Sequence, residues 1–440
     1  MKRLSTTKIF AIGFLTIILL GTGLLSLPVS SNSGEFTNFI DACFTATSAT
    51  CVTGLAVFDT WGYWSLFGQI VILCLIQIGG VGFMTFAVIV TKIFRKKLSI
   101  SNQMIMQESV SAPTVGGVLS LTEVIVFGTL SFEALGAVAY SFFFIPKLGI
   151  AKGIYYSIFH SVSAFCNAGF DLMGYTGEGS LISLQGNIYF NIITMLLIVI
   201  GGLGFFVWVD LWESKFLFNE MRLHTKVVLT VSALLILLGT LLFFLLNMKN
   251  SENMSVGRSI LVSLFHSVSS RTAGFATIDL STITQPLQMI MIILMLVGGS
   301  PGSTAGGFKT TTLGILFFNF KSTFKKKNEV EAFGRSISPA IVKTAFTIFV
   351  MYMFLFIGSA VVISTVEDLP LLTAMFETSS AVATVGLSLN LTPTLGTVSK
   401  LILMFLMYFG RVGPLTIFMA FSSEKFSSVS TLPEEEIKVG

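Results

Sequence analysis

One pattern of side chains occurs four times along this chain. A phenylalanine is followed by a serine four residues later and by a glycine nine or ten residues after the phenylalanine. The four sets are Phe44/Ser48/Gly54, Phe159/Ser163/Gly169, Phe265/Ser269/Gly274 and Phe376/Ser380/Gly386. Chance is the simplest alternative, because small residues are common where helices pack in membranes. The shared register of the three residue types favours a fourfold internal repeat instead.

The residues that end at each glycine could bind a partly dehydrated cation. Backbone carbonyl oxygens can replace the hydration shell of an ion, and glycine lets several chains approach closely. We name these stretches the four glycine segments: Thr50-Cys51-Val52-Thr53-Gly54, Phe165-Cys166-Asn167-Ala168-Gly169, Ser270-Arg271-Thr272-Ala273-Gly274 and Val382-Ala383-Thr384-Val385-Gly386. The fourth contains Thr-Val-Gly, three residues of the filter loop of potassium channels.

Each glycine segment ends a short, semi-apolar stretch or follows it directly. These stretches are residues 38–50, 154–165, 258–270 and 370–382. Twelve helical residues extend roughly 18 Å, less than the about 30 Å of a bilayer's hydrocarbon core. We therefore expect re-entrant helices whose partially negative C-terminal ends point at a common centre, where they stabilise a cation.

Long apolar segments flank the short ones. They are residues 9–27, 68–91, 118–145, 186–209, 226–247, 286–319, 340–364 and 399–421. The first resembles a signal peptide, but it is long enough to span and no small-residue cleavage site follows it. The amino-acid composition also indicates a membrane protein, since 53% of the 440 residues are hydrophobic and only 11% are charged. Soluble proteins have about 25% charged residues, so soluble enzymes, disordered scaffolds and nucleic-acid binders are excluded.

The four cysteines form no redox or metal motif. Cys43, Cys51, Cys74 and Cys166 lie in or beside apolar segments, and no CxxC or His/Cys cluster is present in the sequence. Neither a disulfide framework nor a zinc site is expected. A monovalent cation is the only metal ion that the sequence predicts.

The distribution of basic residues predicts the orientation. If the N-terminus is cytoplasmic, only six of the 26 Lys and Arg residues fall on the opposite side. These are Lys147, Lys152, Lys249, Arg258, Arg271 and Lys400. Basic residues concentrate in cytoplasmic loops, so we expect both termini in the cytoplasm and the four short helices to enter from outside.

The sequence therefore predicts an all-α polytopic membrane protein made of four fused helix–pore-helix–helix repeats. Eight spanning helices and four re-entrant pore helices would surround one central ion pore with fourfold pseudo-symmetry. The expected repeats are residues 1–92, 113–215, 222–325 and 336–422, followed by a cytoplasmic tail at 423–440. A sodium-coupled secondary transporter is the main alternative, but its repeats usually come in inverted pairs, whereas these four share one orientation.

Over residues 8–421 the chain resembles the Ktr/Trk/HKT superfamily of potassium transporters. The phrases ATSATCVTGL, FCNAGF, SRTAGF and TVGL stand where that family has its four filters, and the compact length is most similar to bacterial Ktr membrane subunits. The resemblance implies potassium uptake, without enzymatic activity, across the plasma membrane. In that family a glycine in every filter accompanies potassium selectivity, whereas a serine in the first repeat accompanies sodium passage. Na⁺ as an activator or coupling ion, and a sodium-permeable relative, remain open.

A glycine-rich run interrupts the sixth long segment. It comprises Gly298, Gly299, Ser300, Pro301, Gly302, Ser303, Thr304, Ala305, Gly306 and Gly307, which we name the glycine-rich loop. Such a run cannot continue a helix. A phosphate-binding loop is the enzymatic alternative, but its Gly-Lys-Ser/Thr ending and preceding strand are missing, and a simple kink would need fewer of these residues. The family resemblance implies that the loop obstructs the pore beneath the filter.

Charged and polar residues inside apolar segments need partners. Arg411 lies deep in the last span, where a charge costs on the order of 3 kcal/mol; we expect it to hold the gate, with snorkelling as the alternative. Glu133 in mid-span is expected to make a structural hydrogen bond or to relay protons. His160 and His266 occupy the same position in their short helices as Thr45 and Glu377. For the two histidines, polar anchoring of the helix is expected rather than ligand binding. Arg271 is expected to point back into the protein.

The sequence contains no sensor domain for the predicted gate. The resemblance implies a homodimer resting on a ring of nucleotide-binding RCK proteins that respond to ATP and ADP. The basic runs Arg95-Lys96-Lys97 and Lys325-Lys326-Lys327 could contact such a ring. They could equally set the topology and attract anionic lipid of the bilayer.

Overall fold

The computed structural model describes residues 6–82, 118–247, 254–413 and 417. Within these ranges the chain is almost wholly helical, and the described residues form a single two-stranded antiparallel sheet, β1 (Val330–Ala332) with β2 (Arg335–Ile337). The elements match the predicted all-α class. The expected tail at 423–440 and the basic run at 95–97 lie outside the described residues.

The helices follow one order four times: a long helix, a short helix and a second helix. The first repeat has α1 (Thr6–Leu25), α2 (Phe39–Thr50) and α4 (Leu66–Val81), with α3 (Thr60–Tyr63) in a connection. The second has α7 (Val118–Leu148), α8 (Ile150–Phe165), α9 (Ile188–Leu203) and α10 (Phe205–Glu213). The third has α11 (Leu223–Asn247), α12 (Val256–Ser269), α13 (Gln285–Leu296) and α14 (Thr310–Phe324), and the fourth α15 (Pro339–Glu367), α16 (Leu371–Val382) and α17 (Thr397–Val412).

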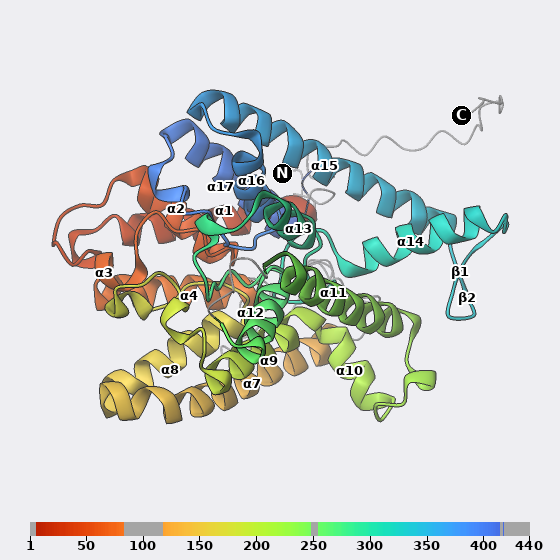
Figure 1. The fold of residues 1–440 in the computed structure, drawn as a ribbon, viewed down its shortest axis with the longest axis horizontal. Coiled ribbons are helices and arrows are strands. Elements are labelled where there is room, and N and C mark those ends of the chain that lie inside the picture. The colour runs from red at the N-terminus through yellow and green to blue at the C-terminus, as the bar shows by residue number, and fades with distance from the viewer. Residues whose placement is uncertain (1–5, 83–117, 248–253, 414–416, 418–440) are drawn as a thin grey trace, which may run out of the picture.

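The four repeats surround a common centre. In Figure 1 the helices α7, α8 and α9 lie at the bottom of the view and α15, α16 and α17 at the top, with α11, α12 and α13 between them. The short helices are the inner ones, and the last five residues of each are buried. Side-chain capping starts two of them: Asn38 accepts from the Ile40 amide, and Ser255 from the Arg258 amide.

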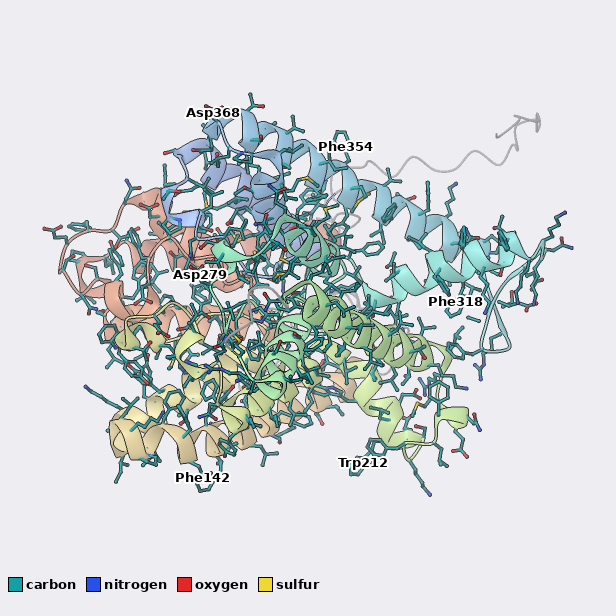
Figure 2. The ribbon with its side chains drawn as sticks, in the orientation of Figure 1. Phe142, Trp212, Asp279, Phe318, Phe354 and Asp368 are labelled. Carbon is teal, nitrogen blue, oxygen red and sulfur yellow. The ribbon has the colours of Figure 1, made fainter. Side chains whose placement is uncertain are left out.

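The first helix of each repeat is long and apolar enough to cross a membrane. These helices are α1, α7, α11 and α15, and their best windows have mean hydropathies of 2.1, 1.5, 2.7 and 2.4. Only 22–28% of those windows is buried inside the protein. Phe142 of α7 and Phe354 of α15 project outward from opposite edges of the molecule (Figure 2) and are 70% and 78% exposed. An outward apolar surface of this kind matches a hydrocarbon environment.

The second helices are shorter than the predicted spans. They end at Val81, Leu203, Leu296 and Val412, and α9 and α10 meet at an angle of 90° rather than forming one straight span over 186–209. Gly82, Gly204 and Gly413 follow three of these ends with φ of 89°, 98° and 92°, a conformation that residues with a Cβ rarely adopt. The predicted break in segment 286–319 is confirmed. Residues 83–91, 414–416 and 418–421 of the expected spans lie outside the described residues.

Candidate functional site

The four glycine segments adopt the same backbone conformation. Each short helix ends, and two left-handed residues follow, one two positions before the glycine and the other the glycine itself. The first of these have φ of 57° (Val52), 59° (Asn167), 77° (Thr272) and 52° (Thr384). The glycines have φ of 94° (Gly54), 71° (Gly169), 81° (Gly274) and 95° (Gly386). Because equivalent positions adopt the same conformation, the four glycine segments are equivalent in structure as well as in sequence.

The four glycines form a closed ring. A Cβ added to Gly54 would stand 2.5 Å from the Ala168 carbonyl oxygen, and one on Gly169 would stand 2.8 Å from that of Ala273. In the same way Gly274 faces the carbonyl oxygen of Val385, and Gly386 faces that of Thr53, which returns to the first repeat. All four contacts are closer than 3.0 Å, so no side chain fits at any of these positions. The carbonyl before each glycine thus lies next to the glycine of the neighbouring repeat.

The serine of the repeated pattern braces each segment. Ser48 Oγ accepts from the Gly54 amide at 3.1 Å, and Ser380 Oγ accepts from the Gly386 amide at 3.0 Å. Ser163 Oγ and Ser269 Oγ instead donate to the carbonyls of Phe170 and Phe275, each at 2.5 Å. The residues of the sequence pattern therefore hold the turn at the ring.

Polar anchoring of the short helices, predicted for His160 and His266, is present in these two repeats and also in the fourth. His160 Nε2 and His266 Nε2 accept the amides of Leu172 and Thr277 at 3.4 Å. Glu377 Oε1 accepts the Leu389 amide at 3.2 Å. These bonds tie each buried short helix to the chain that leaves its glycine segment.

Arg271 points away from the ring, as the sequence predicted. Its Nη2 donates to Ser232 Oγ of α11 at 3.1 Å, and its Nη1 donates to the Ser232 carbonyl at 3.5 Å. The guanidinium is therefore held in the protein interior, and only the backbone of Arg271 belongs to the segment's turn.

A cavity of about 390 Å³ opens on one side of the ring, and the four glycines line it. Three carboxyl groups also line it, those of Asp59, Asp171 and Asp279. Burial raises the pKa of the Asp171 carboxyl to about 6, and the nearby Asp59 carboxylate adds to the rise. Carboxylates around a confined entrance raise the local concentration of cations. Sequence reasoning missed this acidic entrance, although each aspartate follows a ring glycine by two or five residues.

The glycine-rich loop lies at the opposite end of the glycine segments. Thr304 Oγ1 donates to the Phe165 carbonyl at 3.1 Å, and a Cβ on Gly306 would collide with the Thr384 hydroxyl. Backbone bonds tie the loop to the second and fourth repeats: the Phe205 amide donates to the Gly302 carbonyl at 2.7 Å, and the Gly307 amide donates to the Gly410 carbonyl at 3.4 Å. The loop thus contacts the first three residues of the glycine segments, not the glycines that line the cavity.

Two basic side chains hold this loop. Arg411 donates to the Thr304 carbonyl through Nη1 and to the carbonyls of Gly79 and Gly80 through Nη2. Lys309 Nζ donates to the Ala305 carbonyl at 2.8 Å. The contact of Arg411 with the loop is the one that the sequence predicted. Lys309 was missed, although it stands two residues after the loop inside an apolar segment, where a lysine needs a partner.

The structure therefore brings the predicted residues together in two groups, the four glycine segments around one centre and Arg411 against the glycine-rich loop beneath them. No cluster of three or more His, Cys, Asp or Glu side chains suited to a metal ion occurs among the residues that the structure describes.

Comparisons with known proteins identify the family to which this chain belongs. The family model described as "Cation transport protein", TrkH, matches residues 7–429. The potassium/sodium uptake protein NtpJ of Enterococcus hirae is 42% identical over 100% of this chain and 98% of its own length, and the Ktr system potassium uptake protein B of Bacillus subtilis is 36% identical over 100% and 97%. The crystal structure of the potassium transporter TrkH from Vibrio parahaemolyticus superposes with a TM-score of 0.71 at 20% identity, covering 94% of this chain and 85% of that one, which confirms the predicted fold. The chain belongs to the TrkH family of cation transport proteins.

Proposed function

We propose that this protein takes up potassium across the plasma membrane through one selective, gated pore, as the ion-translocating subunit of a Ktr-type system. The observation that carries the proposal is the closed ring, in which each repeat's glycine abuts the carbonyl oxygen of the next repeat. Four equivalent carbonyls around one axis are the ligands that a dehydrated monovalent cation requires. The names of the relatives from Enterococcus hirae and Bacillus subtilis support potassium as the ion.

The four glycine segments are the proposed selectivity filter. Their backbone oxygens would bind K⁺, and their side chains would set the turn, as Arg271 does by pointing toward Ser232. The short helices support this role, because each ends at the start of a glycine segment and directs its partially negative end there. The acidic cavity would collect cations before they enter.

The glycine-rich loop and Arg411 are the proposed gate. The loop contacts the glycine segments on the side away from the acidic cavity, and Arg411 connects it to α4 through Gly79 and Gly80. Opening would require the loop to leave the pore axis while the ring keeps its geometry. A helix interrupted at this point can hinge there.

Sodium transport, coupled or uncoupled, is the alternative. It is supported by the name of the Enterococcus hirae relative, a potassium/sodium uptake protein. The two ions are separated by measuring ⁸⁶Rb⁺ and ²²Na⁺ uptake into liposomes that contain purified protein. Rubidium flux that competes with K⁺ and not with Na⁺ supports the potassium pore. Rubidium flux that requires Na⁺ supports coupling or activation.

A regulatory assembly is also part of the proposal. The relatives of the Ktr system support further Ktr subunits as partners, and we infer a homodimer on an RCK ring, with both termini cytoplasmic. In Figure 1, α14 and the β1–β2 hairpin extend from the right-hand side of the molecule. On the proposed orientation these elements and the run Lys325-Lys326-Lys327 would face the RCK proteins. Co-purification from native membranes, followed by flux with and without ATP or ADP, tests the assembly. A chain that purifies alone and gates without a cytoplasmic protein contradicts it.

A further inference from the structure

A buried carboxyl group lies directly behind the second glycine segment. Glu133 is in the middle of α7 and is only 6% exposed. Gln77 of α4 donates to its Oε2 at 3.0 Å, and the thiol of Cys166 donates to its Oε1 at 3.6 Å. Ser161 of α8 donates to its backbone carbonyl at 2.6 Å. Glu133 thus joins three elements: the outer helix of its own repeat, the short helix with its glycine segment, and the second helix of the first repeat.

Cys166 connects this carboxyl to the turn of the glycine segment. It is the first residue after α8, it is fully buried, and the left-handed Asn167 follows it. On the other side of the thiol, a Cβ added to Gly80 would stand 2.6 Å from Sγ. The thiol is therefore confined between Gly80 and Glu133. The Gly80 carbonyl also accepts from Arg411, at 3.0 Å. The glycine that confines the Cys166 thiol is therefore also bonded to an arginine of the proposed gate.

The third repeat shows that the fold does not require a carboxyl here. Ser267 donates to the Ile236 carbonyl at 2.8 Å, as Ser161 does to the Glu133 carbonyl. The glycines Gly239 and Gly136 stand at the same crossing and face these two serines. Ile236 is therefore the counterpart of Glu133, and an apolar side chain suffices to pack the two helices. The carboxyl in the second repeat serves something other than packing.

The position three residues before the ring glycine is held differently in the third and fourth repeats. Arg271 occupies the place of Cys166 in the third repeat, and Ser232 of α11 holds it from outside. The fourth repeat has Ala383, whose side chain can make no such bond. The second and third glycine segments are thus braced by polar side chains of their outer helices. Of these two outer-helix side chains, Glu133 is ionisable and Ser232 is not.

We propose that Glu133 is a positioning residue that determines ion selectivity: through Cys166 it fixes the turn of the second glycine segment. The inference rests on the proposed function, because it assigns Glu133 a part in that filter. If the Glu133 carboxyl is removed, the buried Cys166 thiol loses its acceptor. The second glycine segment then gains freedom to accommodate a smaller ion. The carboxyl accepts from two donors, so loss of its oxygens, not of its volume, is the effective change.

The test compares Glu133→Leu, Glu133→Gln and Cys166→Ala for the ratio of rubidium to sodium flux in liposomes. We expect Glu133→Leu to lower the ratio about 5-fold, the effect of losing one buried hydrogen bond, and Glu133→Gln to restore most of it because one acceptor oxygen remains. Ile236→Leu, at the equivalent position of the third repeat, is the matched control and should leave the ratio unchanged.

A double-mutant cycle then tests whether Glu133 acts through Cys166. The variant with both Glu133→Leu and Cys166→Ala should have the ratio of Cys166→Ala alone, because the two residues share one interaction. If Glu133→Leu does not fold, Glu133→Met in wild-type and Cys166→Ala backgrounds gives the same comparison, because methionine is close to glutamate in size and also lacks both carboxyl oxygens. A selective wild-type protein whose ratio is unchanged in Glu133→Leu and in Cys166→Ala refutes this inference alone, whereas a wild-type protein without potassium selectivity refutes the proposed function.

Discussion

Replacing Arg411 by alanine should open the proposed gate. The guanidinium donates to the Thr304 carbonyl of the glycine-rich loop and to the Gly79 and Gly80 carbonyls of α4. A hydrogen bond from a charged donor contributes about 1.5–3 kcal/mol. Only the bond to Thr304 binds the loop, so its loss should favour the displaced loop by about 2 kcal/mol, which corresponds to about 30-fold in the closed-to-open equilibrium.

The assay is ⁸⁶Rb⁺ uptake into liposomes at equal protein density, without nucleotide or a regulatory protein. Arg411→Ala should raise the uptake rate well above that of the wild type, and Arg411→Lys should lie between them, since lysine keeps the charge but not the planar fork of donors. Lys400→Ala is the matched control on the same helix, because Lys400 pairs with Asp41 at 2.8 Å and does not contact the loop. Uptake that falls or stays constant in a stably folded Arg411→Ala protein would show that the arginine is merely structural.

Two further predictions concern the loop and the acidic cavity. Deleting several residues of 298–307 should raise rubidium uptake in the absence of any stimulus. Lys309→Met should also raise it, because Lys309 donates to the Ala305 carbonyl of the loop. A constant or lower uptake rate in both variants would indicate that the loop only interrupts the helix and does not gate the pore. Because the pKa of Asp171 is raised to about 6, its carboxylate is charged above that pH and neutral below it. Uptake at low K⁺ should therefore fall as the external pH drops from about 7 to about 5. The variant Asp171→Asn should have lower uptake at the higher pH and a weaker dependence on pH. A pH profile unchanged by the substitution would contradict the electrostatic role.

The ring could be predicted because its geometry requires particular residue types at particular positions. A glycine is required wherever a neighbouring carbonyl leaves no space for a Cβ, and the serine is required to brace the turn. A serine therefore precedes the ring glycine by six residues in three repeats, as Ser48 precedes Gly54, and by five in the third. The direction of Arg271 could be predicted for a similar reason. A filter that uses backbone oxygens has no place for a guanidinium, which must then find a partner such as Ser232.

The bends of the second helices could not be predicted in the same way. Gly82 and Gly204 stand in apolar runs where glycine also serves ordinary helix packing, and only the φ values in the folded protein distinguish the two uses. The partners of Glu133 were equally hidden, because Gln77 is 56 residues away in another repeat. Side chains that meet across repeats depend on how the repeats pack, and a periodic pattern within one repeat does not contain that information.

The most direct test of the central claim is the rubidium-to-sodium flux ratio of the wild-type protein and of the four single variants Gly54→Ser, Gly169→Ser, Gly274→Ser and Gly386→Ser in liposomes. Each glycine has a positive φ, and each would bring a Cβ within 3.0 Å of the next repeat's carbonyl oxygen. The closed ring predicts that the wild type prefers rubidium and that every one of the four substitutions lowers this preference, because each displaces a carbonyl of the same ring. Ion ratios that are unchanged in all four folded variants would contradict a filter formed by these segments.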